Sequence, residues 1–291
     1  MNQTERWVWV DKGLKKEQEA MLPAEMKGVK YGAGCFETFR SYDGRFLHLE
    51  EHIERFNRGL DYLGVPPPKG LNENRVRFLL TELLKINGLS EANARIRMQG
   101  SIGRGGGYAV SPQTSFHLMV TADPLKPQPD QYRLSTVPVR SVPSQCRPAD
   151  LKLSNTLHYM KAWQKAREQQ AEDALMLTVD GYIAETAIAN LFWKSGQVVY
   201  TPSEQCDLLP GILRKAVSTV LTSESGKLAD RLETGKFKPD ALKQADLVWV
   251  TNSVKEIQPV IAVDDNKYPG KDSFYKALDS AFENYKQENL T

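Results

Sequence analysis

Cysteine is scarce in this chain, and the sequence marks of secretion, metal binding and membrane insertion are missing as well. The three cysteines, Cys35, Cys146 and Cys206, are scattered, odd in number and without metal-ligand spacing, which excludes a disulfide framework and fits a reduced compartment. The first residues, MNQTERW, lack the basic and then apolar order of a signal peptide. No apolar run approaches the length of a membrane span. We therefore expect a cytoplasmic protein.

Excess charge of either sign is also lacking. The formal net charge of +2 is too small to indicate binding to nucleic acid or to an anionic membrane surface, so we expect neither partner. Hydrophobic residues make up 41% and charged residues 25%, an ordinary balance for a globular protein that buries a sizeable core. A length of 291 residues suggests two domains or one large one.

Hydrophobic periodicity predicts an α/β chain in which strands and helices follow one another. Alternating patterns predict strands at residues 7–10, 36–40, 94–100, 114–121, 134–139, 198–200 and 247–250. Stripes of helical period predict helices at about 49–63, 76–86 and 156–170, one after Pro210-Gly211, and one that includes Phe274, Leu278 and Phe282. The proline-rich stretch 124–129 is the best linker candidate. We place a domain boundary near Gln128, with a small α/β domain at 1–127 and a larger one at 128–291.

The stretch from 174 to 192 reads as a β-hairpin whose second arm contains Glu185. Asp180-Gly181 is the dipeptide that a tight hairpin turn requires, and apolar residues alternate on either side. Glu185 lies between Ala184 and Thr186, among small and apolar neighbours. A carboxylate there must point to water or be held by a cationic partner. The residues alone leave both readings open.

Three other places offer groups that could meet either solvent or an anion. His52 and Arg55 are three residues apart on the helix predicted at 49–63, where an arginine most commonly faces solvent. Strand alternation puts Arg95 and Arg97 on one face, where they meet either solvent or an anion. Pro210-Gly211 opens a helix whose first amides, those of Ile212 and Leu213, point outward at the positive end of the helix dipole.

Five separated segments together resemble one family. They are the run Tyr31-Gly32-Ala33-Gly34-Cys35-Phe36-Glu37, the pair His52 and Arg55, the pair Lys152 and Asn155, the set Glu185, Asn190, Leu191 and Phe192, and the run from Leu209 to Ile212. In these positions and in this order the chain resembles the class IV pyridoxal-phosphate enzymes, which include branched-chain and D-amino-acid aminotransferases and aminodeoxychorismate lyases. The resemblance implies a fold type IV enzyme of two α/β domains with the cofactor between them, the lysine on the larger domain, and a homodimer.

The resemblance also implies roles for single residues toward pyridoxal 5'-phosphate. Lys152 would bind the cofactor covalently and later move a proton, which requires an amine that can be neutral in a desolvated site. Glu185 would keep the pyridine nitrogen protonated. The remaining cofactor-binding residues, most of them around the phosphate, would be Arg55, Asn190, Ile212, Leu213 and Ser253, and the substrate-binding residues would be Tyr31, Phe36, Arg97 and Asn252.

The implied reaction is amino-group transfer between an amino acid and a 2-oxo acid, and elimination of pyruvate from aminodeoxychorismate is the alternative. Arg95 stands where the family often has an aromatic residue, which argues against a purely apolar substrate pocket. Leu157 and the Asn252-Ser253 turn resemble the lyases more than the branched-chain aminotransferases. Glu37 and the run Lys255-Glu256-Ile257 resemble the aminotransferases. A pyridoxal-phosphate carrier without catalysis is a third possibility, but storage would need no acid at the pyridine nitrogen.

Overall fold

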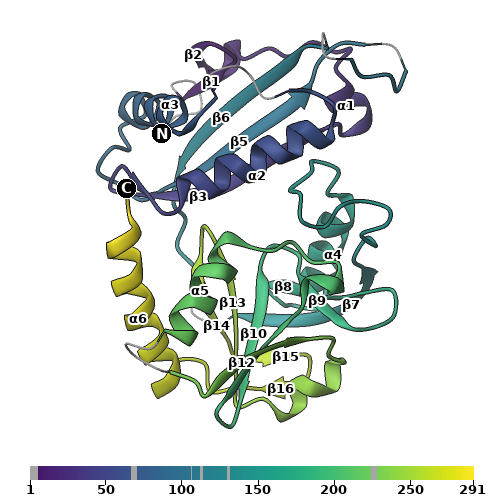
Figure 1. The fold of residues 1–291 in the computed structure, drawn as a ribbon, viewed down its shortest axis with the longest axis vertical. Coiled ribbons are helices and arrows are strands. Elements are labelled where there is room, and N and C mark those ends of the chain that lie inside the picture. The colour runs from purple at the N-terminus through teal and green to yellow at the C-terminus, as the bar shows by residue number, and fades with distance from the viewer. Residues whose placement is uncertain (1–5, 67–70, 106, 112–113, 130–131, 224–227) are drawn as a thin grey trace. The chain divides into compact units, whose positions relative to one another are not determined.

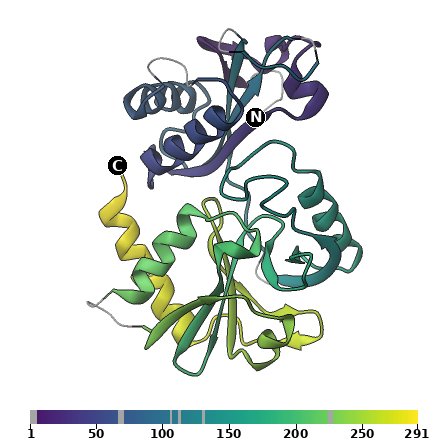
Figure 2. The same cartoon turned by 45° about the vertical axis from the view of Figure 1, so that its right-hand side comes forward.

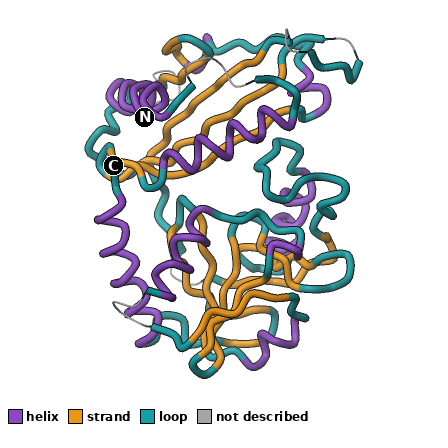
Figure 3. The backbone as a smooth tube through the Cα atoms, in the orientation of Figure 1, coloured by secondary structure: helices purple, strands orange, loops and turns teal. Residues whose placement is uncertain are grey.

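The computed structural model describes residues 6–66, 71–105, 107–111, 114–129, 132–223 and 228–291, and it divides the chain into two compact units (Figure 1). Unit 1 comprises Met1–Lys126, Leu151–Asn155 and Leu290–Thr291, and unit 2 comprises Pro127–Asp150 and Thr156–Asn289. Helices and strands occur in both units, which confirms the α/β prediction (Figure 3). The short segment with Lys152 belongs to unit 1, whereas the sequence analysis assigned it to the larger domain.

Unit 1 is built on a six-stranded sheet in the order β2-β1-β6-β5-β3-β4, in which every neighbouring pair is antiparallel. Along β5, Ile96 and Met98 are buried while Arg95 and Arg97 are exposed, as the alternation predicts. β6 begins at Phe116, two residues after the predicted start. The strands are β1 (Trp7–Val10), β2 (Gly13–Lys16), β3 (Gly34–Tyr42), β4 (Arg45–Phe46), β5 (Ala94–Ile102) and β6 (Phe116–Pro124).

Two helices of similar length pack on this sheet. α2 (Leu49–Tyr62) contacts β3, and α3 (Glu73–Ile86) contacts β1 and β6. The apolar stripe of α2 is buried in the core of the unit, as its periodicity predicts. α3 begins three residues before its predicted start because the Asn72 side chain accepts a hydrogen bond from the Arg75 amide at 3.0 Å and caps the helix. The short helices α1 (Lys27–Tyr31) and η2 (Glu17–Glu19) complete the unit.

Unit 2 contains two five-stranded sheets, in the orders β12-β11-β10-β13-β14 and β16-β15-β7-β8-β9. The pairs β11–β12, β7–β8 and β15–β7 are parallel, and the others are antiparallel. Side chains of both sheets share one hydrophobic core. The strands are β7 (Arg133–Arg140), β8 (Asp173–Leu177), β9 (Ile183–Thr186), β10 (Asn190–Ser195), β11 (Val198–Pro202), β12 (Arg231–Gly235), β13 (Leu247–Asn252), β14 (Glu256–Val260), β15 (Ala262–Val263) and β16 (Asn266–Lys267).

Three longer helices lie on the sheets of unit 2. α4 (Leu157–Glu168) packs on β7 and β8 through Ala162 and Ala166, and it leaves its other face exposed. α5 (Ile212–Thr222) and α6 (Ser273–Asn289) contact each other (Figure 2). The 3-10 helices η3 (Glu204–Cys206) and η5 (Pro239–Gln244) lie in the connections. Within the described ranges, no helix is long and apolar enough to cross a membrane.

Candidate active site

Glu185 lies on the second arm of a hairpin, as predicted. β8 and β9 pair antiparallel, and the turn between them places Gly181 at a φ of +76°, a conformation that glycine adopts without strain. Thr178 closes the turn because its amide donates to the Tyr182 carbonyl at 2.8 Å. Only 4% of Glu185 is exposed to solvent, so the hairpin holds its carboxylate in the interior of unit 2.

Hydroxyl and amide groups donate to the Glu185 carboxylate. The Tyr159 hydroxyl donates to Oε1 at 2.6 Å, and the Leu209 amide donates to the same oxygen at 3.2 Å. Asn190 Nδ2 donates to Oε2 at 3.2 Å. The sequence predicted water or a cationic partner for this acid. Its carboxylate is buried rather than turned to water, and the hydroxyl and amide donors favour its charged form. The Arg214 guanidinium is also near enough for the two charges to interact.

Asn190 also joins Glu185 to the start of α5. Its Nδ2 donates to the Leu209 carbonyl at 2.8 Å, and its Oδ1 accepts from the Gly211 amide at 3.1 Å. Gly211 is the N-cap residue of α5, so the amides of Ile212 and Leu213 lie in the first turn of the helix. The first amides of a helix lack carbonyl partners within it. The same side chain therefore fixes both a buried carboxylate and a helix end suited to an anion.

Ser253 lies in a turn that Asn252 shapes. Asn252 Oδ1 accepts from the amides of Val254 and Lys255 at 2.9 and 2.8 Å. Its Nδ2 donates to the Ile188 carbonyl at 3.0 Å. Both ends of the Asn252 side chain are thus used to hold the turn between β13 and β14, and Ser253 is half-buried within it.

In unit 1, Lys152 lies along the edge of β3. Its carbonyl accepts from the Phe36 amide at 2.9 Å, and the Ser154 amide donates to the Gly34 carbonyl at 2.8 Å. The Lys152 Nζ is 4.8 Å from the centroid of the Phe36 ring. Backbone hydrogen bonds and an isolated bridge between Cys35 and Leu153 thus hold this loop segment against β3, with the lysine beside Phe36.

Arg97 meets the same ring. Its guanidinium carbon is 3.9 Å from the Phe36 centroid, and its Nη2 donates to Gln99 Oε1 at 2.9 Å. Gln99 Nε2 in turn donates to Ser154 Oγ at 2.7 Å. Three of the predicted residues, Phe36, Arg97 and Lys152, are thereby brought together on unit 1, with two cations that suit an anionic ligand.

Arg55 is buried on α2 against Glu37. Arg55 Nε and Nη2 donate to the two carboxylate oxygens of Glu37 at 2.7 and 2.8 Å, and His52 Nδ1 lies 2.7 Å from Oε2. Burial alone would raise the pKa of Glu37, but the Arg55 guanidinium and His52 lower it to about 2. Burial lowers the pKa of His52. The arginine is therefore held in one orientation by an ionised carboxylate.

Tyr31, another predicted substrate-binding residue, packs against Tyr108. It ends α1 and is 46% exposed, with its ring centroid 5.2 Å from that of Tyr108. Gly32 follows it at a φ of +65° and ends the helix.

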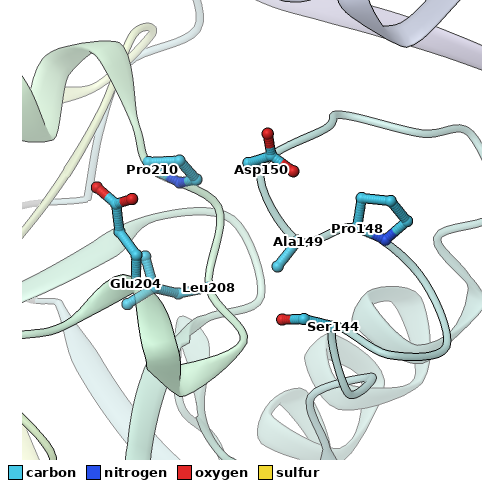
Figure 4. A pocket seen from close by; sticks show the side chains of 7 residues that line it. All are labelled: Ser144, Pro148, Ala149, Asp150, Glu204, Leu208 and Pro210. Atoms are coloured by element: carbon cyan, nitrogen blue, oxygen red, sulfur yellow. The ribbon is translucent and has the colours of Figure 1, made fainter. Parts of the chain in front are cut away.

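A cavity of about 290 Å³ lies in unit 2 beside the loop that contacts Glu185 (Figure 4). Its described lining comes from two loops and includes none of the predicted site residues. It consists of Ser144, Pro148, Ala149, Asp150, Glu204, Leu208 and Pro210. The Ser144 amide and hydroxyl donate to Asp207 Oδ1 at 2.8 and 2.6 Å, which ties the two loops together. Leu208 and Pro210 flank Leu209, so this cavity borders the carboxylate site from outside it.

The sequence analysis missed Tyr159 and Gln99. The helical pattern contained a signal for Tyr159, because Ala162 and Ala166 follow it at three and seven residues and these alanines are buried. Gln99 follows Arg97 on the same face of β5, where alternation alone would have placed it. In the described part of the chain, no group of histidine, cysteine and acidic residues is arranged to hold a metal ion.

The sequence is similar to proteins of the class IV aminotransferase family. A family model described as "Amino-transferase class IV" matches residues 34–263. An aminodeoxychorismate lyase of Bacillus subtilis is 30% identical over 264 residues, which cover 90% of this chain and 88% of the relative. A D-alanine aminotransferase of Bacillus licheniformis is 27% identical and covers 86% of both chains.

Solved structures show the same fold. A branched-chain aminotransferase from Thermoproteus uzoniensis, crystallised with norvaline, superposes with a TM-score of 0.87 at 24% identity. The superposition covers 98% of both chains. At this level of identity the likeness establishes the fold and nothing finer.

Proposed function

The chain belongs to the class IV aminotransferase family, and from that premise we propose that it transfers an amino group between an amino acid and a 2-oxo acid. Members of this family are pyridoxal-phosphate enzymes, either aminotransferases or lyases, and this chain is an enzyme of that kind.

The observation that supports this function best is the buried carboxylate of Glu185. A carboxylate that is 4% exposed and contacted by hydroxyl and amide donors is suited to pair with a protonated ring nitrogen. When bound, pyridoxal phosphate supplies a ring that draws electrons from the substrate carbon. Glu185 would hold the proton on the ring nitrogen, and Asn190 would fix Glu185 relative to α5.

Other residues fit the remaining parts of the cofactor. Lys152 would bind it covalently and move the proton. Arg55, the amides of Ile212 and Leu213, and Ser253 would hold its phosphate. The start of α5 is closely packed, because a Cβ at Gly211 would be 2.2 Å from Asn190 Oδ1. A helix start and a planar guanidinium are both suited to phosphate.

The substrate would meet residues of the Phe36 face and the Asn252 turn. Arg97 would pair with a substrate carboxylate, since its fork of donors matches that group and Phe36 supports it from one side. Tyr31, Phe36 and Asn252 complete the proposed substrate set. Arg95 on the same strand face adds a second cation, although Asp123 pairs with it at 2.9 Å.

Elimination of pyruvate from aminodeoxychorismate is the second candidate. Its support is the 30% identity to the Bacillus subtilis lyase over most of both chains. Both reactions would use the same cofactor and the same lysine. The residues named above suit either one, because both substrates contain carboxylates.

We also propose that the protein is a cytoplasmic homodimer. Three large apolar residues on one face of α4 support the dimer, because Leu157, Met160 and Trp163 are 65%, 56% and 42% exposed. The scattered free cysteines support a reduced compartment.

One experiment separates the candidate reactions. Purified protein is incubated with pyridoxal phosphate and 2-oxoglutarate and a panel of L- and D-amino acids, and separately with aminodeoxychorismate. Glutamate formation supports transfer, and pyruvate without glutamate supports the lyase. A cofactor spectrum that no donor changes, with neither product formed, would contradict both and leave a carrier.

A second experiment tests Lys152. Borohydride reduction of the cofactor-loaded protein should fix a pyridoxyl group on Lys152, and peptide mapping reads its position. Lys152→Ala should abolish this label, while Lys255→Ala, which changes a lysine of unit 2, should keep it. A label on another lysine in the wild type would refute the assignment.

A further inference from the structure

The Tyr159 hydroxyl donates a short hydrogen bond to the Glu185 carboxylate. The hydroxyl is 2.6 Å from Oε1, whereas the Leu209 amide and Asn190 lie at 3.2 Å. Tyr159 comes from the first turn of α4, and Glu185 from β9, so the contact joins two separate elements. Burial, and then the Glu185 charge, raises the pKa of Tyr159 well above its ordinary value. The phenol is therefore a neutral donor throughout the physiological range.

Arg147 lies near the tyrosine. It is buried, and its guanidinium carbon is 5.8 Å from the centroid of the Tyr159 ring. A positive charge near a phenol favours loss of the phenolic proton and so makes the O–H group a stronger donor. The charge of Arg147 therefore strengthens the hydrogen bond that Tyr159 donates to Glu185 Oε1.

The neighbouring histidine adds no charge beside this hydrogen bond. His158 lies with its ring centroid 4.0 Å from that of Tyr159. Burial and the Arg147 charge lower the pKa of His158 to about 4. It is neutral near pH 7, so the hydrogen bond from Tyr159 and the charge of Arg147 act without competition from an imidazolium.

We propose that Tyr159 is a positioning residue for Glu185, which it holds in the ionised form and in the orientation that keeps the cofactor's ring nitrogen protonated. This inference rests on the proposed function, in which Glu185 contacts that nitrogen.

The physical reason is the competition between two bases for one proton. A hydrogen bond donated to a carboxylate stabilises the charged form and lowers its basicity. The proton shared with the ring nitrogen then stays on nitrogen, and the carboxylate remains an anion. Without the Tyr159 hydroxyl, Glu185 becomes more basic and less fixed, and the proton moves toward it.

The test uses the cofactor-loaded protein with pyridoxal phosphate labelled with ¹⁵N in the ring. The ¹⁵N shift distinguishes protonated from unprotonated ring nitrogen directly. In the wild type it should lie in the protonated range. In Tyr159→Phe it should move toward the unprotonated range, and turnover should fall roughly tenfold, the effect of losing one hydrogen bond to a charged group. The dissociation constant of the cofactor should change little.

Tyr268→Phe is the matched control. Its hydroxyl is also buried in unit 2, but it donates to the Leu242 carbonyl at 2.8 Å. This variant should keep the wild-type ¹⁵N shift and turnover. In a Glu185→Gln background, Tyr159→Phe should produce no further change in the shift, because the carboxylate on which it acts is gone.

A second variant keeps the inference testable if Tyr159→Phe does not fold. Difluorotyrosine at position 159 retains the hydroxyl and the packing and is a stronger donor, so the ¹⁵N shift should stay in the protonated range up to a higher pH than in the wild type. Wild-type shift and turnover in Tyr159→Phe, or a difluorotyrosine variant whose shift leaves the protonated range at the wild-type pH, would overturn the role of Tyr159 alone. A wild type that binds no cofactor would instead overturn the proposed function on which it rests.

Discussion

Glu37 shows how a single buried charge can be made stable. Its side chain has no exposed surface, yet it is ionised, because both of its oxygens accept from Arg55 and one also lies beside His52. An ionised carboxylate removed from water is costly unless it is paired and hydrogen-bonded. Glu37 therefore fixes the orientation of the Arg55 guanidinium through these two hydrogen bonds.

The pH dependence of this cluster has a definite sign. The pKa of Glu37 is lowered from 4.5 to about 2 in the folded protein, so its contribution to stability is complete above about pH 4.5 and is lost as pH falls toward 2. The pKa of His52 is also lowered, so protonation of the unfolded chain below its ordinary pKa of 6.5 acts in the same direction. Both groups make unit 1 less stable in acid.

Glu37→Gln should lower the free energy of unfolding by about 3–5 kcal/mol near pH 7, because it removes the carboxylate that pairs with the buried Arg55 charge. The difference from wild type should shrink as pH falls toward about 3. Urea unfolding at several pH values measures both effects. Glu54→Gln removes an exposed carboxylate from the same helix and should have little effect. An equal loss in both variants would mean that the buried pair adds nothing specific.

At the scale of elements, the start of α5 depends on one close approach. Gly211 lies against Asn190 Oδ1, and Asn190 also contacts Glu185. Gly211→Ala should push the asparagine away and tilt the first turn of the helix. Overpacking of this kind costs about 1–3 kcal/mol. We expect the dissociation constant of pyridoxal phosphate to rise about tenfold, which corresponds to 1.4 kcal/mol.

Absorbance titration with the cofactor measures this change. Gly13→Ala is a suitable control, because a Cβ at Gly13 meets nothing within 4 Å. Unchanged cofactor affinity in Gly211→Ala would show that the start of α5 does not contribute to the phosphate site.

Elements set by local chemistry could be predicted from the sequence. The hairpin around Glu185 follows from Asp180-Gly181, because a turn dipeptide acts over four residues. The apolar stripe of α2 repeats over several helical turns, so the sequence pattern alone predicts the helix. Tyr159 and Glu185 are 26 residues apart on different elements, and no local pattern pairs them.

The segment with Lys152 shows a second limit. It joins unit 1 through backbone hydrogen bonds to β3, with the Phe36 amide as one donor. Backbone donors and acceptors are the same in nearly every residue, so the sequence contains no mark of this pairing. The linker near Gln128 is marked by prolines, whereas the return at Leu151–Asn155 is not.

At the scale of the whole molecule, the exposed face of α4 bears on assembly. Leu157, Met160 and Trp163 lie within one arc of the helix and are all exposed. If this face is part of a homodimer, Met160→Glu should place a charge in an apolar contact and shift the protein toward monomer. Analytical ultracentrifugation over a range of concentrations measures the shift, which we expect to be at least tenfold in the dissociation constant.

Lys165→Glu changes a charge at an exposed position outside that arc and should leave the assembly as in wild type. A wild type that is monomeric at high concentration, or a dimer that Met160→Glu does not weaken, would contradict the role of this face.

The division of the chain between the two units has a consequence for how such a protein can be inherited. Unit 1 takes its residues from three separate stretches, and the backbone of Lys152 and of Thr291 bonds to strands far earlier in the sequence. A gene segment that encodes residues up to Lys126 therefore lacks parts of the unit it begins. A gene segment that starts at Pro127 encodes Leu151–Asn155 and Leu290–Thr291, which belong to unit 1 and bond to strands that this gene segment does not encode. Recombination at the proline-rich linker therefore cannot exchange either unit intact.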